Sequence, residues 1–508
     1  MSANAYLYAL FAAIFPDDLS SCCIETEDAR YFSWLDIERA SAKIANLLSS
    51  LHLQAGARVA VQVEKSAEAL ILYLATIRAG YVYLPLNTAY RDAEVEYFLR
   101  DAEPEVVVCA PQQFGWVSQL AFKTGTRHVF TLDAPATGNN SGSLLQRALS
   151  HPDQFETVQS APNDLAAILY TSGTTGRSKG AMLTHDNLAS NAKVLKQAWG
   201  WNKDDVLLHA LPLFHVHGLF VASHGALLNG TKMIFLSKFN ATQVLRYLPR
   251  TTVFMGVPTY YVRLLQEANF KQETCKNMRV FISGSAPLLL DTFLEFTRQT
   301  GLTILERYGM SKTAMLTSNP YEGKRVGGTV GKPLAGVGVR AVTSENLACA
   351  TGEVGDIQVK GANVFKGYWR MPEKTAEEFT SDGYFRTGDV GKFDCDGYLS
   401  IVGRSKDLII SGGYNVYPKE IESIIDDMPE VLESAVIGFP HAEFGEAVVA
   451  IIILKPGKTL VELTLIARLK AMIANFKVPK NVYFSDELPR NTMGKVQKNI
   501  LRALYQKD

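Results

Sequence analysis

The chain has 508 residues, more than one hydrophobic core usually holds, so at least two domains are expected. Its 51 Lys plus Arg balance 51 Asp plus Glu, so the charge gives no support to nucleic acid or a membrane as a partner. The six cysteines lack the spacing of a zinc or redox motif, which is typical of reduced cysteines in a cytoplasmic protein.

The first residues predict an amphipathic helix and lack the basic region of a leader or transit peptide, with a cleaved leader as the alternative. The apolar stretch 69–86 is interrupted by Arg78, Gly80 and Pro85, which favours a buried helix and a strand over a membrane span. Hydrophobic patterning predicts strands at 58–63, 81–85, 106–109 and 165–170, and a helix at 67–79. Strands that are apolar on both faces suit parallel sheets covered by helices, so an α/β fold is expected.

A second, smaller domain is expected at the C-terminal end. Residues 352–402 predict short strands separated by glycine turns, and we place the domain boundary directly after them. The chain would then divide into an N-terminal domain, 1–403, and an α+β domain, 404–508. Within the latter we expect a helix at 418–427, strands at 435–439 and 448–454, and a helix at 463–476.

The strand predicted at 165–170 leads into a glycine-rich loop, residues 170–180, YTSGTTGRSKG. Glycines let backbone N–H groups approach an anion, hydroxyls add donors, and a lysine adds a mobile positive charge. The predicted phosphate-binding residues are Thr171, Ser172, Gly173, Thr174, Thr175, Gly176 and Lys179. A flexible linker is the alternative, whereas the spacing from Gly173 to Lys179 does not fit a Walker A loop.

Five further motifs accompany this loop: LPLFHVHG at 211–218, ERYGM at 306–310, YFRTGD at 384–389, GRSKDL at 403–408 and PRNTMGK at 489–495. With them the chain resembles the acyl-adenylate-forming superfamily of acyl-CoA synthetases, luciferases and peptide-synthetase adenylation domains. Segments such as FISGSAPLL and SGGYNVYPKEIES make it most similar to malonyl-CoA synthetases. The resemblance implies ATP, Mg²⁺ and coenzyme A as cofactors, malonate as substrate, and a C-terminal lid that rotates between two half-reactions.

The resemblance also implies roles for single residues. Lys495 would carry adenylation, with Lys179 and His215 as further catalytic residues, because the attack of a carboxylate on phosphate gathers negative charge. Asp389 and Arg404 would bind the nucleotide, Tyr308 would stack on adenine, and Lys406 would be the hinge. The other predicted nucleotide or coenzyme A contacts are Gly284, Ala286, Pro287, Glu306, Arg307, Gly309, Met310, Ser311, Gly412 and Gly413.

A site that binds malonate must accommodate a second negative charge. A malonate enzyme must hold a second carboxylate, and an uncompensated buried charge is costly. Arg263 and Ser285 match the family positions for this role, through charge-assisted hydrogen bonds. His215 and Met310 are expected to line the same pocket. A salt-bridged helix arginine is the alternative reading of Arg263.

One motif departs from the family. A glutamate that helps to hold Mg²⁺ is expected two residues after Met310, and here the residue is Lys312, whose ammonium group cannot ligate a metal. No metal ligand is therefore assigned. The alternatives are a ligase for another short acid, such as methylmalonate or acetate, or a catalytically impaired nucleotide-binding homologue.

Overall fold

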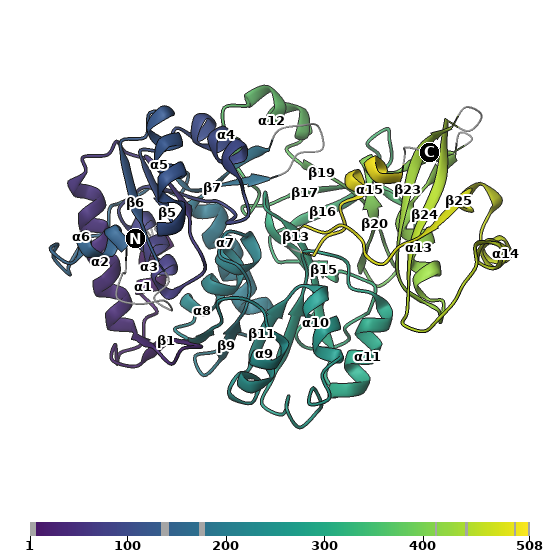
Figure 1. The fold of residues 1–508 in the computed structure, drawn as a ribbon, viewed down its shortest axis with the longest axis horizontal. Coiled ribbons are helices and arrows are strands. Elements are labelled where there is room, and N and C mark those ends of the chain that lie inside the picture. The colour runs from purple at the N-terminus through teal and green to yellow at the C-terminus, as the bar shows by residue number, and fades with distance from the viewer. Residues whose placement is uncertain are drawn as a thin grey trace.

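The computed structural model describes residues 7–133, 142–171, 178–411, 414–441, 445–491 and 494–505. Helix-covered sheets form a large lobe, and a five-stranded sheet forms a small lobe at the other end of the long axis (Figure 1). The α/β expectation is confirmed.

The largest sheet has nine strands in the order β15-β14-β13-β12-β11-β9-β10-β1-β2. Its strands are β1 (Cys22–Thr26), β2 (Tyr31–Ser33), β9 (Val206–His209), β10 (Lys232–Phe235), β11 (Val253–Gly256), β12 (Val280–Ser283), β13 (Ile304–Met310), β14 (Ala314–Ser318) and β15 (Lys332–Pro333). The neighbours β9, β11, β12 and β13 are parallel, so their carboxyl ends meet at one edge.

The second sheet has seven strands in the order β18-β8-β7-β4-β3-β5-β6. Its strands are β3 (Arg58–Gln62), β4 (Val82–Pro85), β5 (Val106–Cys109), β6 (His128–Thr131), β7 (Leu165–Thr171), β8 (Lys179–Thr184) and β18 (Gly367–Tyr368). The pairs among β3 to β7 are parallel as expected, but β8 returns antiparallel to β7. This return pairs Lys179 with Thr171 across the two strands.

Twelve helices of the described ranges surround these sheets. They are α1 (Leu7–Ala12), α2 (Trp34–Ser50), α3 (Ala67–Arg78), α4 (Asp92–Ala102), α5 (Phe114–Lys123), α6 (Gly142–Ala148), α7 (His185–Ala198), α8 (His224–Leu227), α9 (Ala241–Tyr247), α10 (Pro258–Leu265), α11 (Leu290–Thr300) and α12 (Pro372–Glu378). A π-helix, His217–Ser223, leads into α8. Every residue of α3 is buried, which explains why its sequence is apolar on all sides. No helix in the described ranges is both long enough and apolar enough for a bilayer crossing.

A four-stranded antiparallel sheet leads to the small lobe. It contains β16 (Gly338–Val342), β17 (Gly355–Lys360), β19 (Phe385–Phe393) and β20 (Leu399–Arg404). The small lobe contains β21 (Ile409–Ser411), β22 (Tyr414–Val416), α13 (Pro418–Asp426), β23 (Val431–His441), β24 (Gly445–Leu454), α14 (Glu462–Met472), β25 (Asn481–Phe484) and α15 (Lys498–Tyr505). The boundary at 403/404 remains a prediction, and the chain changes sheet beside it.

Most expected elements are confirmed within one or two residues, including the strands β3, β4, β5 and β7 and the helices α3 and α13. The helix predicted over 463–476 was too long. It ends at Met472, and the chain continues as a 3₁₀ turn, Asn475–Lys477.

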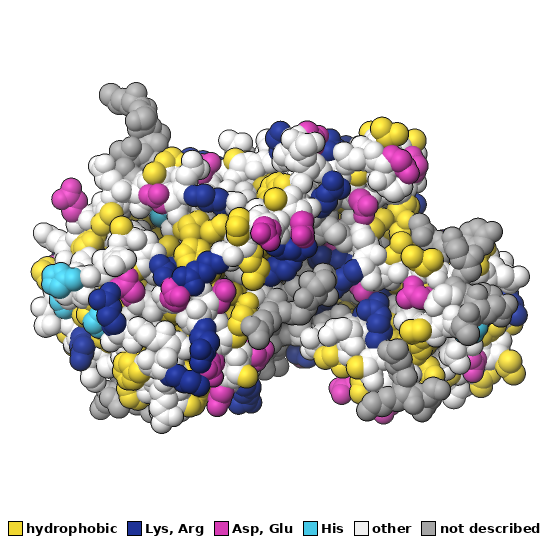
Figure 2. Space-filling model, turned by 90° about the horizontal axis from the view of Figure 1, so that it is seen from above, with side chains coloured by type: hydrophobic (Ala, Val, Ile, Leu, Met, Phe, Trp, Pro, Cys, Tyr) yellow, Lys and Arg dark blue, Asp and Glu magenta, His cyan; other side chains and the backbone are white. Residues whose placement is uncertain are grey.

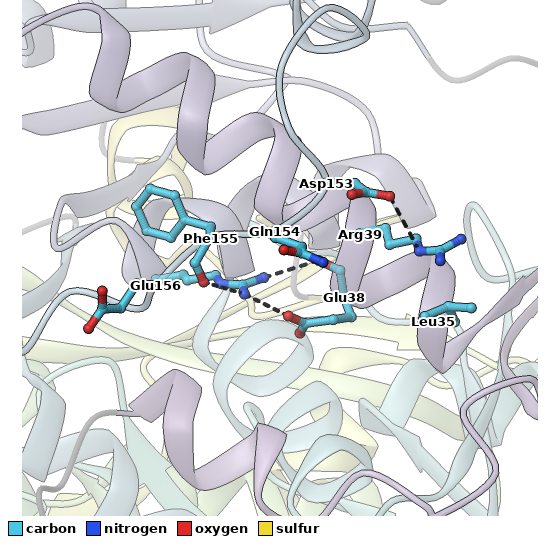
Figure 3. A pocket seen from close by; sticks show the side chains of 8 residues that line it. Leu35, Glu38, Arg39, Asp153, Gln154, Phe155 and Glu156 are labelled. Carbon is cyan, nitrogen blue, oxygen red and sulfur yellow. Dashed lines mark hydrogen bonds and ion pairs between the residues drawn. The ribbon is translucent and has the colours of Figure 1, made fainter.

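Arg78, the last residue of α3, is buried and links the segment before β7 to α2 through hydrogen bonds. Arg78 donates to the Glu38 carboxylate at 2.6 Å, to the Glu38 carbonyl at 3.0 Å and to the Phe155 carbonyl at 2.8 Å. Figure 3 shows Glu38 and Phe155 on either side of this contact, with the ion pair of Arg39 and Asp153 nearby. The Arg78 side chain is only 4% exposed, whereas that of Arg39 is 57% exposed.

We expect Arg78→Ala to lower the melting temperature of the large lobe by on the order of 5 °C. Removing Arg78 takes donors away from two partly buried carbonyls and leaves the Glu38 carboxylate with the Tyr8 hydroxyl as its donor, at a cost of about 2–4 kcal/mol, which is below that of a fully buried pair because Glu38 keeps some contact with water. Differential scanning calorimetry measures the shift. Arg39→Ala is the matched control and should melt as the parent does. Equal melting of the two variants would show that the Arg78 contacts do not stabilise the fold.

Candidate functional site

The predicted site residues gather at the edge where the parallel strands of the nine-stranded sheet end. His215, Ser285 and Lys312 lie in segments that follow β9, β12 and β13. In open α/β sheets, ligands bind outside the carboxyl ends of the strands. Figure 2 shows Lys and Arg side chains gathered in the hollow between the two lobes. The position and the charge both suit an anionic ligand.

Tyr308, Asp389 and Arg404 form one hydrogen-bonded group. Asp389 on β19 lies opposite Arg404 on β20, and the Arg404 Nε is 2.6 Å from the Asp389 carboxylate. The Tyr308 hydroxyl donates to the same carboxylate. Burial, and then the charge of Asp389, raises the pKa of Tyr308, so the phenol stays protonated. The three residues assigned to adenine and ribose are thus brought together.

A tight turn of the small lobe presents Lys495 to this group. The Lys495 amide donates to Asn491 Oδ1 at 2.9 Å, and the Gly494 carbonyl accepts from Arg490 at 2.6 Å. Gly494 has a φ of +75°, and a Cβ there would meet the Thr259 side chain at 3.1 Å, so only glycine allows this approach. Partial burial, and then the charge of Arg404, lowers the pKa of Lys495 to about 8.

The predicted hinge lies between two anchors on opposite lobes. Lys406 is exposed in the 3₁₀ turn Ser405–Asp407. On one side, Ser405 donates to Asp356 on β17 at 2.7 Å. On the other side, Asp407 pairs with Arg502 on α15 at 3.1 Å. A change in the backbone angles at Lys406 would turn one anchor relative to the other, as a hinge requires.

Two histidines and a serine contact one another in the segments that follow β9 and β12. His217 Nδ1 lies 3.3 Å from the Ser285 hydroxyl, and the His215 Nδ1 accepts from the His217 amide at 3.2 Å. Ser285 has a φ of +73°, an uncommon conformation for a serine that is often found at functional sites. Burial, and then Arg307, lowers the pKa of His215 to about 4 and that of His217 well below its usual value. Both rings are neutral at pH 7.

Arg307 is the residue that lowers the pKa of both histidines, and it is 3% exposed. Its Nε and Nη2 have no hydrogen-bond partner among the described residues. Burial lowers its pKa to about 9, so it remains charged at pH 7. The guanidinium packs against Gly284, where a Cβ would lie 2.5 Å from its Cζ. A buried guanidinium whose N–H groups lack partners favours the binding of an anionic ligand.

Two further predicted residues are Arg263 and Glu306. Arg263 is exposed on α10, the helix whose Thr259 lies against Gly494 of the turn before Lys495, and its role in binding the acid stays a prediction. The Glu306 side chain is buried and accepts from the Leu288 amide at 3.1 Å, so it holds the loop after β12. Burial raises the pKa of Glu306 to about 8.

The remaining predicted residues have mixed positions. Met310 and Ser311 lie half-buried at the end of β13, Gly284 is buried, Ala286 is half-buried and Pro287 is exposed. Thr171 and Lys179 border the glycine-rich loop, but Ser172, Gly173, Thr174, Thr175 and Gly176 lie outside the described residues, as do Gly412 and Gly413.

Lys179 and Lys312 share one carboxylate. The Lys179 Nζ lies 3.2 Å and the Lys312 Nζ 3.7 Å from opposite oxygens of Glu378, on α12. An ammonium group therefore occupies the position where the family places a metal ligand, and the only nearby carboxylate among these contacts is already paired with lysines. The described residues contain no group of three or more His, Cys, Asp or Glu that could hold a metal ion. A protein-ligated Mg²⁺ does not fit this position.

The structure adds His217 and Glu378 to the candidate site residues, and neither was predicted from the sequence. His217 stands two residues after His215 in the same motif, so its spacing was a usable signal. Glu378 carries no motif of its own, and only the packing of α12 against β18 brings it to the lysines.

Comparison with known proteins agrees with this geometry. Residues 11–369 match the family described as AMP-binding enzyme, and residues 420–495 match the AMP-binding enzyme C-terminal domain. A malonate–CoA ligase of Arabidopsis thaliana is 38% identical over 480 residues, which cover 88% of this chain and 78% of that protein.

The crystal structure of ATP-bound MatB from Rhodopseudomonas palustris is 53% identical, covers 99% of both chains and superposes with a TM-score of 0.96. The apo form of the same protein superposes with a TM-score of 0.85. The two lobes are therefore arranged more nearly as in the ATP-bound relative. The first family model matches more than half of the chain, and the chain belongs to the AMP-binding enzyme family.

Proposed function

We propose that this chain is an AMP-forming ligase that activates malonate as malonyl-adenylate and transfers the malonyl group to coenzyme A. The observation that carries the choice of acid is Arg307, a buried guanidinium whose Nε and Nη2 have no partner among the described residues. A monocarboxylic acid would leave this cation uncompensated, whereas the second carboxylate of malonate would pair with it. Ser285 and His217, which lie within 3.3 Å of each other, would complete the contact.

In the first half-reaction, a carboxylate oxygen of malonate attacks the α-phosphorus of ATP. The bond from this phosphorus to the bridging oxygen breaks, and pyrophosphate leaves with the bonding electrons. Lys495 lies beside the Asp389 and Arg404 pair that would hold the ribose, so its ammonium group can offset the charge that gathers between the two anions. Mg²⁺ would come with the nucleotide and would supply further positive charge at its phosphates.

In the second half-reaction, the coenzyme A sulfur attacks the acyl carbon, its proton is released, and AMP leaves with the oxygen that linked it to the acyl group. The hinge at Lys406 would turn the small lobe between the two steps. Gly412 and Gly413, outside the described residues, are proposed to approach the pantetheine arm. The cytoplasmic location stays a prediction from the sequence.

The test is acid-dependent release of pyrophosphate together with formation of the acyl-CoA product. Malonate, methylmalonate, acetate and octanoate are compared with ATP, Mg²⁺ and coenzyme A present. We expect malonate to give the highest kcat/KM, and acetate to be slower by a factor of about 100 or more, the value of a lost charge-assisted contact. Faster turnover of acetate or octanoate would contradict the assignment of malonate. Nucleotide binding without turnover of any acid would instead indicate an impaired homologue.

A further inference from the structure

A cluster of four side chains lies where the family would bind its metal. The carboxylate of Glu378 accepts from Lys179 at 3.2 Å and from the Tyr368 hydroxyl at 2.5 Å, and it pairs with Lys312 at 3.7 Å. The Lys312 ammonium also donates to the Tyr368 hydroxyl at 3.2 Å and lies 4.6 Å from the centre of the Phe385 ring. The Lys312 side chain is only 16% exposed. Lys312 is therefore held in place and is not a freely solvated surface lysine.

The location of Lys312 points to the nucleotide phosphates. β13 carries Tyr308, which binds the Asp389 and Arg404 group, and Lys312 follows two residues after that strand ends. Lys179 lies at the C-terminal end of the glycine-rich loop. Because one carboxylate pairs with both ammonium groups, Lys312 lies close to Lys179 as well as to the strand that carries Tyr308.

The charges at this position can be compared directly. A carboxylate ligand with its Mg²⁺ contributes one net positive charge to the phosphate site, and a single lysine contributes the same net charge. Two ammonium groups held together repel each other in a half-buried place, and Glu378 offsets this repulsion when no nucleotide is bound. Phosphate oxygens would serve the two lysines as a replacement counter-anion.

We infer that Lys312 contacts the triphosphate directly, together with Lys179, and supplies the charge that a metal-bound glutamate would otherwise supply. The inference rests on the proposed ATP-dependent function and concerns how that same site recognises its nucleotide. It follows that ATP without Mg²⁺ binds about as well as Mg-ATP. In a site with a glutamate at this position, metal-free ATP would meet an additional negative charge and bind more weakly.

The test is the dissociation constant of ATP, measured by isothermal titration calorimetry on the full chain without malonate or coenzyme A. Each protein is titrated once with excess EDTA and once with excess Mg²⁺. For the parent chain we expect the two constants to agree within about threefold. For Lys312→Glu we expect the constant in EDTA to exceed that in Mg²⁺ by about tenfold or more, which corresponds to about 1.4 kcal/mol. Lys203→Glu makes the same charge change at an exposed position and should behave as the parent does.

Lys312→Glu would face Glu378 and could disturb the fold, so two further variants are included. Lys312→Gln should weaken binding of metal-free ATP by about tenfold, since it removes the cation without adding an anion. The exchange Lys312→Glu with Glu378→Lys keeps an ion pair and should favour Mg-ATP as the single variant does. A parent chain that already prefers Mg-ATP tenfold, or a Lys312→Gln variant with unchanged binding in EDTA, would overturn the inference. Because no acid is present, failure to turn over malonate would not affect these results.

Discussion

Replacing Lys495 by alanine is expected to slow malonyl-adenylate formation by a factor on the order of 10²–10³, the usual cost of removing one group that stabilises charge in the transition state. Transfer of the malonyl group from supplied malonyl-adenylate to coenzyme A should change little, because no phosphate is attacked in that step. Malonate-dependent exchange of pyrophosphate into ATP measures the first step. Formation of malonyl-CoA from synthetic malonyl-adenylate measures the second.

Lys470→Ala is the matched control, since Lys470 is exposed on α14 of the same lobe. It should retain both steps at the rate of the parent. Equal losses of both steps in Lys495→Ala would indicate a misplaced lobe. Exchange at the parental rate would show that Lys495 does not act in adenylation.

The same assignment predicts the dependence of adenylation on pH. A lysine carries its charge below its pKa, and partial burial together with Arg404 lowers the pKa of Lys495 to about 8. The exchange rate should therefore fall as the pH rises through about 8. Lys495→Arg keeps a charge in this range, so the alkaline fall should move to higher pH. Identical alkaline limbs in the parent and the arginine variant would assign that limb to another group.

Much of the fold could be predicted because the hydrophobic pattern of each helix and strand matches the burial of its faces in the structure. The helix α3 is apolar on all sides and is buried on all sides, and the strands β3, β4 and β5 are apolar on both faces within a helix-covered sheet. The antiparallel return of β8 was not predictable in this way. Strand patterning reports which faces are buried but carries no information about strand direction.

The nucleotide site shows which residue positions a sequence motif predicts and which it does not. Tyr308, Asp389 and Arg404 each belong to a separate motif, and the pairing of β19 with β20 joins the last two. Glu306 belongs to the same motif as Tyr308, yet its side chain turns to Leu288. Glu306 and Tyr308 lie two residues apart on β13 and share a face, whereas Arg307 between them points to the other face, so a shared motif does not place all its members in one site. Glu378 lies far along the chain from Lys179, and only the three-dimensional packing brings them together.

The acid site has two candidate arginines, one suggested by a sequence motif and one by burial in the structure. Arg263 was chosen from its place in a motif; its side chain is exposed on α10, and its role stays a prediction. Arg307 was grouped with the nucleotide contacts, and burial beside His215 and His217 shows its different surroundings. The face of a short helix depends on what packs against it, which the periodicity of eight residues does not determine.

Arg307 and Arg263 are expected to differ strongly in their effect on malonate turnover. Arg307→Met is expected to lower kcat/KM for malonate by a factor on the order of 10²–10³, because it removes two donors of charge-assisted hydrogen bonds from a buried site. Methionine fills a similar volume without a charge, so the pocket should stay closed to water. Turnover of acetate, which has no second carboxylate, should be unchanged or should rise. The kcat/KM values of both acids, measured side by side, separate loss of specificity from loss of folding.

Arg263→Met is the matched control and should change kcat/KM for malonate by less than about threefold, as expected of an exposed side chain. If Arg263→Met instead lost malonate selectively while Arg307→Met kept it, the carboxylate would have to bind at the surface end of α10. Such a site would be open to water, and water would compete for the arginine and weaken the contact. A strong preference for malonate over acetate therefore requires the buried arginine, and the size of that preference measures how completely the pocket excludes water.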